Sequence, residues 1–336
     1  MTLMIDIAKS FFISIIVILI IEIFLSFNQN LKLNASNEDL ITYDAYNEIR
    51  SNSPNIYSKS FGSKVYTDIN GFRIPHPNYI YPDNYSKRIL LLGDSVTFGP
   101  GVIEENTFSG LLRKNYPNYY IMNSSVNGYN LDSYFSLSKK ILQDNSFDQV
   151  LMIMCLNDVY DHAETIYNAS LQSNAVYVVE NFRKINFILH ANNFLRSYSR
   201  IYLLIKGIFT DPSYRYFVID YQNYENDANY MSQIETLDKI ANLFKINDIK
   251  FTIIISPYEY QLREDLEADS EIINYPQKKL KEFFENHEIN FHDPYEFFME
   301  NNKKDKKQLF LSFDPMHLSE AGHQEMYNFI KKTLLN

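Results

Sequence analysis

Four short apolar runs stand out along the chain, at residues 88–92, 120–122, 149–155 and 251–255. Each run is continuous rather than alternating, which is typical of strands that are buried on both faces. Helical patterns lie between and after them, at residues 107–115, 131–143, 230–245, 277–286 and 319–334, and Ser319 is a suitable N-cap for the last. Strands of this kind that alternate with helices predict an α/β fold, a three-layer α/β/α sandwich with a central parallel sheet.

The N-terminal part of the chain carries a different pattern, a long apolar run at residues 11–27 that only Ser14, Glu22 and Ser26 interrupt. One helix of this length spans roughly 25 Å, which is slightly less than the thickness of a hydrocarbon core. Residues 1–28 are therefore predicted to form a single-pass transmembrane anchor. A cleaved signal peptide is the alternative, but the run is longer than a usual signal-peptide core and no clear small-x-small cleavage site follows it.

The orientation of this anchor is weakly marked, because Lys9 precedes the run and Lys32 follows it. A domain that follows one N-terminal apolar helix is most simply explained as exported, so we expect the body of the protein to be extracytoplasmic. A cytoplasmic body held by the same helix is the alternative.

The rest of the chain divides into a polar part and a larger part that carries the strand and helix patterns. Residues 29–85 are polar and rich in turn signals, and they are predicted to be a linker and lead-in. Residues 86–336 are predicted to form the main domain, with an insertion at about 159–229 that is too long for a connecting loop. Because the insertion contains an amphipathic piece at 194–209 and many tyrosines, it is interpreted as a helical hairpin packed on the sheet, with a substrate lid or a sugar-stacking surface as alternatives.

Composition and charge narrow the classes of function. The chain has 336 residues, 46% of them hydrophobic, which is enough for a sizeable core. A net charge of -10 argues against nucleic acid as a partner, because such binding depends on clustered cations. The single cysteine, Cys155, excludes an intramolecular disulfide and a thiolate zinc site. No metal or other cofactor is expected, and His287, His292 and Asp293 are interpreted as ordinary strand-flanking residues.

The strongest candidate for chemistry is Ser95, which follows Gly93 and Asp94 at the end of the first predicted strand. In parallel sheets this edge is where ligands bind, and a serine raised there on a tight turn is exposed for nucleophilic attack. Five of the nine glycines fall between positions 93 and 128, so backbone freedom is concentrated around this serine. A turn that merely caps the following helix would have the same sequence, so a partner is needed.

The partner lies near the C-terminus, where Asp314 stands three residues before His317. This spacing lets a short loop present both side chains. A histidine can then accept the serine proton, while the carboxylate fixes the histidine tautomer and stabilises the imidazolium that forms. The other six histidines lack such company and are interpreted as structural.

These segments, with two between them, resemble the sequence blocks of the SGNH (GDSL-type) hydrolase superfamily. The residues around Ser95 and the Asp314-x-x-His317 segment are similar to its first and last blocks, and Gly128 and Asn157 match the glycine and asparagine of its middle blocks. The resemblance implies an SGNH-hydrolase-like, flavodoxin-like sheet. It also implies an oxyanion hole made of the Ser95 and Gly128 amides and the Asn157 side chain.

One residue departs from the family pattern, because Cys155 stands where the third block usually has glycine. This change puts in doubt the local backbone geometry and the space beside the oxyanion pocket. Cys155 itself is not expected to be a nucleophile, because it ends an apolar strand and a buried thiol resists ionisation.

The segment Asn70-Gly71-Phe72-Arg73 also resembles a membrane-anchored subgroup that is found with cell-surface polysaccharide genes. This resemblance implies an esterase or acyltransferase that acts on O-acyl groups, most simply O-acetyl groups, of carbohydrate. The expected partners are an acyl-ester or carbohydrate substrate and the membrane. The alternative function is a catalytically lapsed, membrane-tethered glycan-binding or assembly protein, which Cys155 and the tyrosine-rich insertion would favour.

Overall fold

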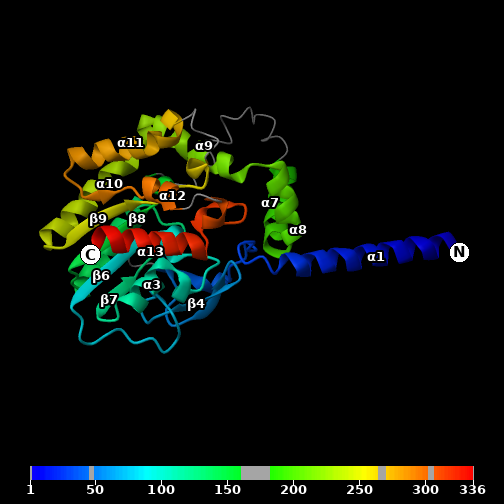
Figure 1. The fold of residues 1–336 in the computed structure, drawn as a ribbon, viewed down its shortest axis with the longest axis horizontal. Helices are drawn as coiled ribbons and strands as arrows, with labels where there is room; N and C mark the ends of the chain where they lie inside the picture. The colour runs from blue at the N-terminus through cyan, green and yellow to red at the C-terminus, as the bar shows by residue number, and fades with distance from the viewer. Residues whose placement is uncertain (1, 45–48, 160–181, 264–269, 302–305, 336) are drawn as a thin grey trace.

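The computed structural model describes residues 2–44, 49–159, 182–263, 270–301 and 306–335 (Figure 1). Its centre is an eight-stranded sheet in the order β10-β9-β8-β6-β7-β5-β4-β3. The five strands on one side of this order are parallel: β6 (Lys87–Gly93), β7 (Tyr119–Asn123), β8 (Gln149–Met154), β9 (Lys250–Ile255) and β10 (Phe291–His292). Taken along the chain, they follow the flavodoxin-like order 2-1-3-4-5. The predicted α/β class and the four predicted strands are confirmed, and β10 is an additional, two-residue strand.

Helices cover both faces of this sheet and give it three layers (Figure 1). On one side α4 (Leu131–Asp144) packs on α10 (Asp227–Ile246), and on the other α3 (Phe108–Asn115) packs on α13 (Glu320–Leu334). The connection through α3 leads from β6 to its neighbour on one side, β7, and the connection through α4 leads from β7 back past β6 to β8. Because both crossovers are right-handed and run in opposite directions across the sheet, α3 and α4 lie on opposite faces. The remaining helices of the body are α2 (Ser95–Phe98), α9 (Pro212–Glu225), α11 (Ser270–Asn286) and α12 (Tyr295–Asn301).

The sheet is mixed rather than wholly parallel, because the lead-in adds three antiparallel strands to it. They are β5 (Arg73–Ile74), β4 (Ser63–Thr67) and β3 (Tyr57–Ser60), and β5 joins β7 through the pair Arg73 and Asn123. A separate hairpin of β1 (Ile41–Asp44) and β2 (Ile49–Asn52) precedes them. These strands were not predicted from the sequence, because they are short and largely polar and lack a continuous apolar run.

The insertion contains α7 (Phe182–Tyr198) and α8 (Arg200–Phe209) before α9. The amphipathic piece expected at 194–209 is divided at Ser199, whose hydroxyl accepts a hydrogen bond from the Tyr202 amide and so caps α8. Residues 160–181 of the expected insertion lie outside the described residues. Whereas α9 packs on α10 and α11, α8 contacts α7 and the N-terminal helix.

The N-terminal helix, α1 (Thr2–Leu25), extends away from the body (Figure 1). Within the described residues it is the one helix that is long and apolar enough to cross a membrane, with a mean hydropathy of 2.5 over Ile5–Leu25. A signal sequence near the N-terminus can also be this apolar, and the anchor is therefore a proposal.

A buried charge cluster ties the lead-in to the turn that follows Ser95. Arg73 is fully buried, and its guanidinium donates to the carbonyl oxygens of Phe98, Gly99 and Val102. Glu104 lies between two arginines, with its carboxylate 3.2 Å from Arg73 Nε and paired with Arg113. Arg73 thus holds the loop after α2 through three carbonyl groups that have no strand partner.

We expect Arg73→Met to lower the free energy of unfolding by about 3–5 kcal/mol, because it leaves a buried carboxylate short of one partner. The measurement is denaturant unfolding of the purified chain. Arg215→Met, which replaces an exposed arginine, is the control and should change stability by less than about 0.5 kcal/mol. Equal effects of the two substitutions would contradict this role of Arg73.

Candidate active site

Ser95 is the first residue of α2, directly after the central strand β6. The turn is tight because Gly93 has no side chain, and a Cβ there would lie 2.0 Å from Thr97 Oγ1 and 2.9 Å from the Ile153 carbonyl oxygen. Asp94 caps α2, and its Oδ1 accepts a hydrogen bond of 2.8 Å from the Val96 amide. The Gly-Asp-Ser turn therefore caps a helix and also presents the serine at the carboxyl edge of the sheet.

Residues 314 and 317 meet Ser95 across more than two hundred positions of sequence. His317 Nε2 lies 2.8 Å from Ser95 Oγ, and His317 Nδ1 lies 2.7 Å from Asp314 Oδ2. The short loop that the sequence analysis expected is instead the strand β12 (Asp314–Leu318), which pairs with β11 (Phe310–Leu311). The serine, the imidazole and the carboxylate are thus arranged in the order that a serine triad requires.

The charges around the imidazole favour its protonated form. Burial lowers the pKa of His317, but the charge and hydrogen bond of Asp314, together with the charge of Asp94, outweigh burial and raise it above the usual value. Burial also raises the pKa of Asp314, but the charge and hydrogen bonds of His317 bring it below its usual range. Asp314 is therefore ionised, and it stabilises the imidazolium that forms when His317 accepts a proton.

A second acceptor lies close to the serine hydroxyl, because Ser95 Oγ is 3.2 Å from Asp94 Oδ2. The hydroxyl has one proton, and the shorter contact of 2.8 Å to His317 is the one that can lead to proton transfer. The contact between Asp94 and the Ser95 hydroxyl was not expected from the sequence.

Two aromatic residues with strained backbones flank the histidine and the aspartate. Phe61 has φ 47° and contacts the His317 ring edge-on, with 5.5 Å between the ring centroids. Phe313 has φ 62° and directly precedes Asp314. Bulky residues are uncommon in the left-handed region, and such strain is often found at functional sites. Phe313 leaves no space beside Gly207 of α8, where a Cβ would lie 2.0 Å from the phenyl ring.

The two remaining predicted residues lie at the same edge of the sheet as Ser95. Gly128 follows β7 in a turn with φ 77° and is exposed, and Asn157 follows β8 and is buried. Because β7 and β8 are the parallel neighbours of β6, their carboxyl ends flank Ser95. Their expected role in an oxyanion hole is taken up below as a proposal.

Buried acidic groups hold the segment that carries Asn157. Asp158 Oδ2 accepts hydrogen bonds of 2.8 Å from the Cys155 amide and the Tyr134 hydroxyl. Burial raises the pKa of Asp158 well above its usual value. Burial likewise raises the pKa of the Cys155 thiol, as expected for a residue that is not a nucleophile.

The side chain of Cys155 connects the segment that carries Asn157 to the insertion. Cys155 Sγ lies 3.5 Å from the Tyr258 hydroxyl, which is hydrogen-bonded to Asp220 of α9. Burial raises the pKa of Asp220 to about 8. Asp158 ends the third sequence block, but no role was assigned to it from the sequence, and no motif surrounds Asp220.

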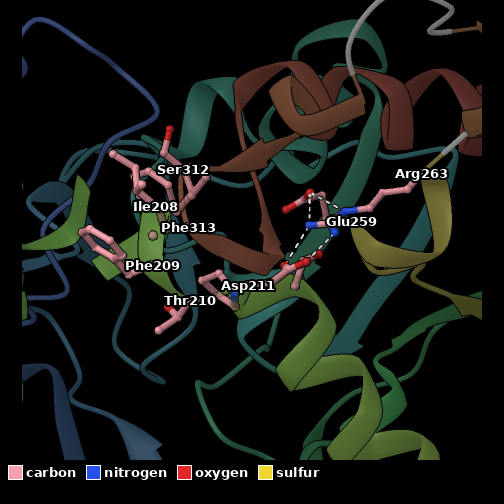
Figure 2. A pocket seen from close by; sticks show the side chains of 12 residues that line it. Ile208, Phe209, Thr210, Asp211, Glu259, Arg263, Ser312 and Phe313 are labelled. Carbon is pink, nitrogen blue, oxygen red and sulfur yellow. Dashed lines mark hydrogen bonds and ion pairs between the residues drawn. The ribbon is translucent and has the colours of Figure 1, made fainter. Parts of the chain in front are cut away.

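A cavity of about 510 Å³ is shown in Figure 2, and Phe313 of its wall directly precedes Asp314. Its walls come from the end of α8, the start of α9, Glu259 and Arg263, and the segment that ends at Phe313. Arg263 makes two hydrogen bonds to Asp211, of 2.6 and 2.9 Å, and pairs with Glu259 at 3.3 Å. The Glu259 amide donates to the Pro315 carbonyl oxygen at 2.9 Å, so this wall is attached directly to β12.

No group of residues that could hold a metal ion is found in the part of the chain that the structure describes. His292 is the last residue of β10, and Asp293 follows it. His287 instead pairs with Asp238, with 3.1 Å between Nδ1 and Oδ1, beside the start of β9 and far from Ser95.

Comparisons with known proteins give structural likenesses only. No family model matches the chain, and no curated protein matches it. A lipolytic protein of the G-D-S-L family from Veillonella parvula is 14% identical with a TM-score of 0.42, over 74% of this chain and 98% of that one. An acetyl xylan esterase is also 14% identical, with a TM-score of 0.44 and coverages of 74% and 99%. A psychrotrophic esterase from Pseudoalteromonas is 14% identical, with a TM-score of 0.41 and coverages of 75% and 100%.

The first of these structures carries the family name that the four sequence blocks suggest. At these identities and TM-scores, however, the likeness carries no weight for function. The chemistry proposed below rests on the geometry of this chain's own residues.

We expect kcat/KM for a neutral acetyl ester to rise with pH through a midpoint above about 6.5, the ordinary histidine value. Only neutral His317 can accept the Ser95 proton, and its raised pKa delays deprotonation. Asp314→Asn should move the midpoint to lower pH and reduce kcat about 10⁴-fold. Asp238→Asn, which breaks the distant His287 pair, should change neither. A midpoint that stays in place after Asp314→Asn would refute this account of the base.

We expect Gly207→Ala to lower kcat/KM by up to about a hundredfold, because the new methyl group displaces Phe313 and with it Asp314. Alanine is otherwise favoured over glycine inside a helix by about 1 kcal/mol, so a loss of activity would come from the collision of the new methyl group with Phe313. The same substitution in a Phe313→Ala background should cost little. A double-mutant cycle measures this coupling, and additive effects of the two changes would argue against it.

Proposed function

We propose that the chain is a serine-dependent ester hydrolase or O-acyltransferase that acts on O-acyl groups through an acyl-Ser95 intermediate. One observation carries this proposal: His317 Nε2 lies 2.8 Å from Ser95 Oγ while its other ring nitrogen lies 2.7 Å from Asp314. Hydrogen bonds of this length, in this order, are what a histidine needs to take the serine proton.

The reaction proceeds in two halves. Ser95 Oγ attacks the ester carbonyl carbon as His317 takes the hydroxyl proton, and the alkoxide of the substrate leaves with that proton as an alcohol. Water, or a hydroxyl group of an acceptor, then attacks the acyl-enzyme while His317 removes its proton and returns it to Ser95. The amides of Ser95 and Gly128 and the side chain of Asn157 are proposed to stabilise the oxyanion in each half.

Carbohydrate-linked acyl groups, most simply O-acetyl groups, are the proposed substrates. The resemblance of Asn70-Gly71-Phe72-Arg73 to a polysaccharide-associated subgroup first suggested them. The cavity beside Asp314 is compatible with a sugar, because it combines exposed Phe209 with the carboxylates and guanidinium of Asp211, Glu259 and Arg263. We further propose that α1 anchors the protein in a membrane with the body outside the cytoplasm.

A lapsed enzyme that retains only glycan binding is the second candidate. Cys155 in place of a glycine, and the tyrosine-rich insertion, favour it. In the structure, however, Cys155 is buried against Tyr258, and its amide is bound by Asp158. The side chain therefore occupies the body's interior beneath the Asn157 segment.

A serine-reactive fluorophosphonate should label wild-type protein and should fail to label Ser95→Ala. Turnover of an acetyl ester should fall by several orders of magnitude in Ser95→Ala and in His317→Ala. Ser146→Ala, which removes an exposed hydroxyl before the start of β8, controls for the loss of a serine elsewhere. Undiminished turnover in Ser95→Ala would end the assignment, and absent labelling together with glycan binding would favour the lapsed enzyme.

The hydrolase and the transferase differ only in what reaches the acyl-enzyme. Products are therefore measured by mass spectrometry from one acetyl donor, with and without an oligosaccharide acceptor. An acetylated oligosaccharide as the main product would identify a transferase, and free acetate whatever the acceptor would identify a hydrolase.

A further inference from the structure

Glu22 of the apolar helix α1 is bound by the start of α8. Its carboxylate accepts hydrogen bonds from the Ser199 hydroxyl at 2.5 Å and from the backbone amides of Arg200 and Ile201, each at 3.0 Å. An ionisable group inside an apolar span is costly unless it is paired, and helix N-terminal amides suit a carboxylate. These bonds fix the start of α8 beside one particular turn of α1.

A second attachment lies where α7 ends. The Ser197 hydroxyl donates to the Asn34 carbonyl oxygen at 2.9 Å, and the Asn34 amide donates to the Arg196 carbonyl oxygen at 3.1 Å. The junction of α7 and α8 is therefore tied both to α1 and to the chain that follows it. In Figure 1 both helices stand between the body and the outward-running α1.

The depth of this junction follows from helix geometry. Glu22 lies three residues before Leu25, the last residue of α1, so along the helix axis it is about 4–5 Å from the end of this helix. Amphipathic helices that lie on a bilayer bury their apolar face about 5–10 Å into the boundary between headgroups and acyl chains. The start of α8 is thus at the depth that such a helix occupies.

The side chains that α7 and α8 leave uncovered are apolar. On α8, Ile205 is 50% exposed, and Ile208 and Phe209 are more exposed still; they repeat at the spacing of one helix face. On α7, Phe194, Leu195 and Tyr198 are exposed. Apolar side chains that gather in this way on one surface of a soluble body usually mark an interaction site.

The charge of this segment differs from that of the rest of the chain. Between residues 190 and 215 there are four cations, Arg196, Arg200, Lys206 and Arg215, and one carboxylate, Asp211, in a chain whose net charge is -10. Burial lowers the pKa of Lys206, and the nearby charges of Arg196 and Arg215 lower it further. Cations gathered beside an exposed apolar face suit a surface of anionic lipid headgroups.

We propose that α7 and α8 lie on the surface of an anionic bilayer that α1 crosses, with the exposed apolar face of α8 inserted among the headgroups. The inference rests on the proposed membrane anchor and is independent of the acyl chemistry. Because Ile208 and Phe209 also line the cavity beside Asp314, the contact holds the mouth of that cavity at the membrane surface. It therefore favours an acyl donor or acceptor that is presented at that surface.

The test uses the full chain in lipid nanodiscs with an environment-sensitive fluorophore attached to one introduced cysteine. Cys155 is buried and reacts poorly, so labelling is directed to the new site. The probe positions are Ile205→Cys on α8, Ile13→Cys within α1, and Ile246→Cys as the control. Ile246 is exposed at the end of α10, at the edge of the sheet opposite Ser95. Nitroxide-labelled lipids serve as the quencher.

We expect the probes at positions 13 and 205 to lose most of their fluorescence, and the probe at 246 to lose none. Neutral lipids in place of anionic ones should weaken the quenching at 205 and leave position 13 unchanged. Quenching at 13, with position 205 behaving like position 246, would overturn the proposal. So would a probe at 205 that is shielded from water but not quenched, because a second copy of the chain would then cover this face.

An unquenched probe at position 13 would overturn the anchor and the surface contact together. Fluorophosphonate labelling of Ser95 is measured on the same samples. A failure of the serine chemistry is therefore seen separately from a failure of the membrane contact.

Discussion

The contact between the Ser95 hydroxyl and the His317 imidazole is the constraint on which the other features of this fold depend. It joins the end of the central strand β6 to β12, near the other end of the chain. Several contacts support this closure: β12 packs on α2 and α9, α13 packs on α3, and the Pro315 carbonyl oxygen accepts a hydrogen bond from the Glu259 amide. The parallel sheet thus fixes the serine, while the C-terminal helix and the Glu259 segment bring the histidine to it.

The lead-in and the insertion, which lie outside the four sequence blocks, also support the contact between Ser95 and His317. Arg73 of the lead-in holds the loop after α2 through three carbonyl oxygens, and Phe61 packs on the His317 ring. In the insertion, Gly207 lies against Phe313. Asp220 is hydrogen-bonded to Tyr258, whose hydroxyl contacts Cys155. The insertion is therefore connected both to the segment that carries Asp314 and to the segment that carries Asn157. Through Glu22 it is also connected to α1.

Much of this arrangement could be predicted from the sequence because its signals are local. Continuous apolar runs identified β6 to β9, and Ser319 marked the start of α13, where its hydroxyl accepts a hydrogen bond from the Gly322 amide. The pairing of Asp314 with His317 followed from their spacing. The motif around Ser95 did not by itself distinguish a cap from a nucleophile, and in the structure Asp94 caps α2 beside a half-buried serine.

What could not be predicted depends on tertiary contacts. Strands β3 to β5 carry no continuous apolar run, because they extend one edge of the sheet, and β10 has only two residues. Arg73 looked like part of a subgroup motif, and nothing in its neighbours indicated that it would be buried against carbonyl groups. In the sequence, Glu22 is only an interruption of an apolar run. Its hydrogen-bond partners at the start of α8 are about 180 positions away, so no local pattern indicates them.

The most direct test of the central claim is mass spectrometry of the peptide that contains Ser95, after rapid acid quenching of the enzyme during turnover of an acetyl ester. The account predicts one acetyl group on Ser95, formed in the wild type and lost in His317→Ala. An unmodified Ser95 in an enzyme that is turning over the ester, or an acetyl group carried by another residue, would contradict it.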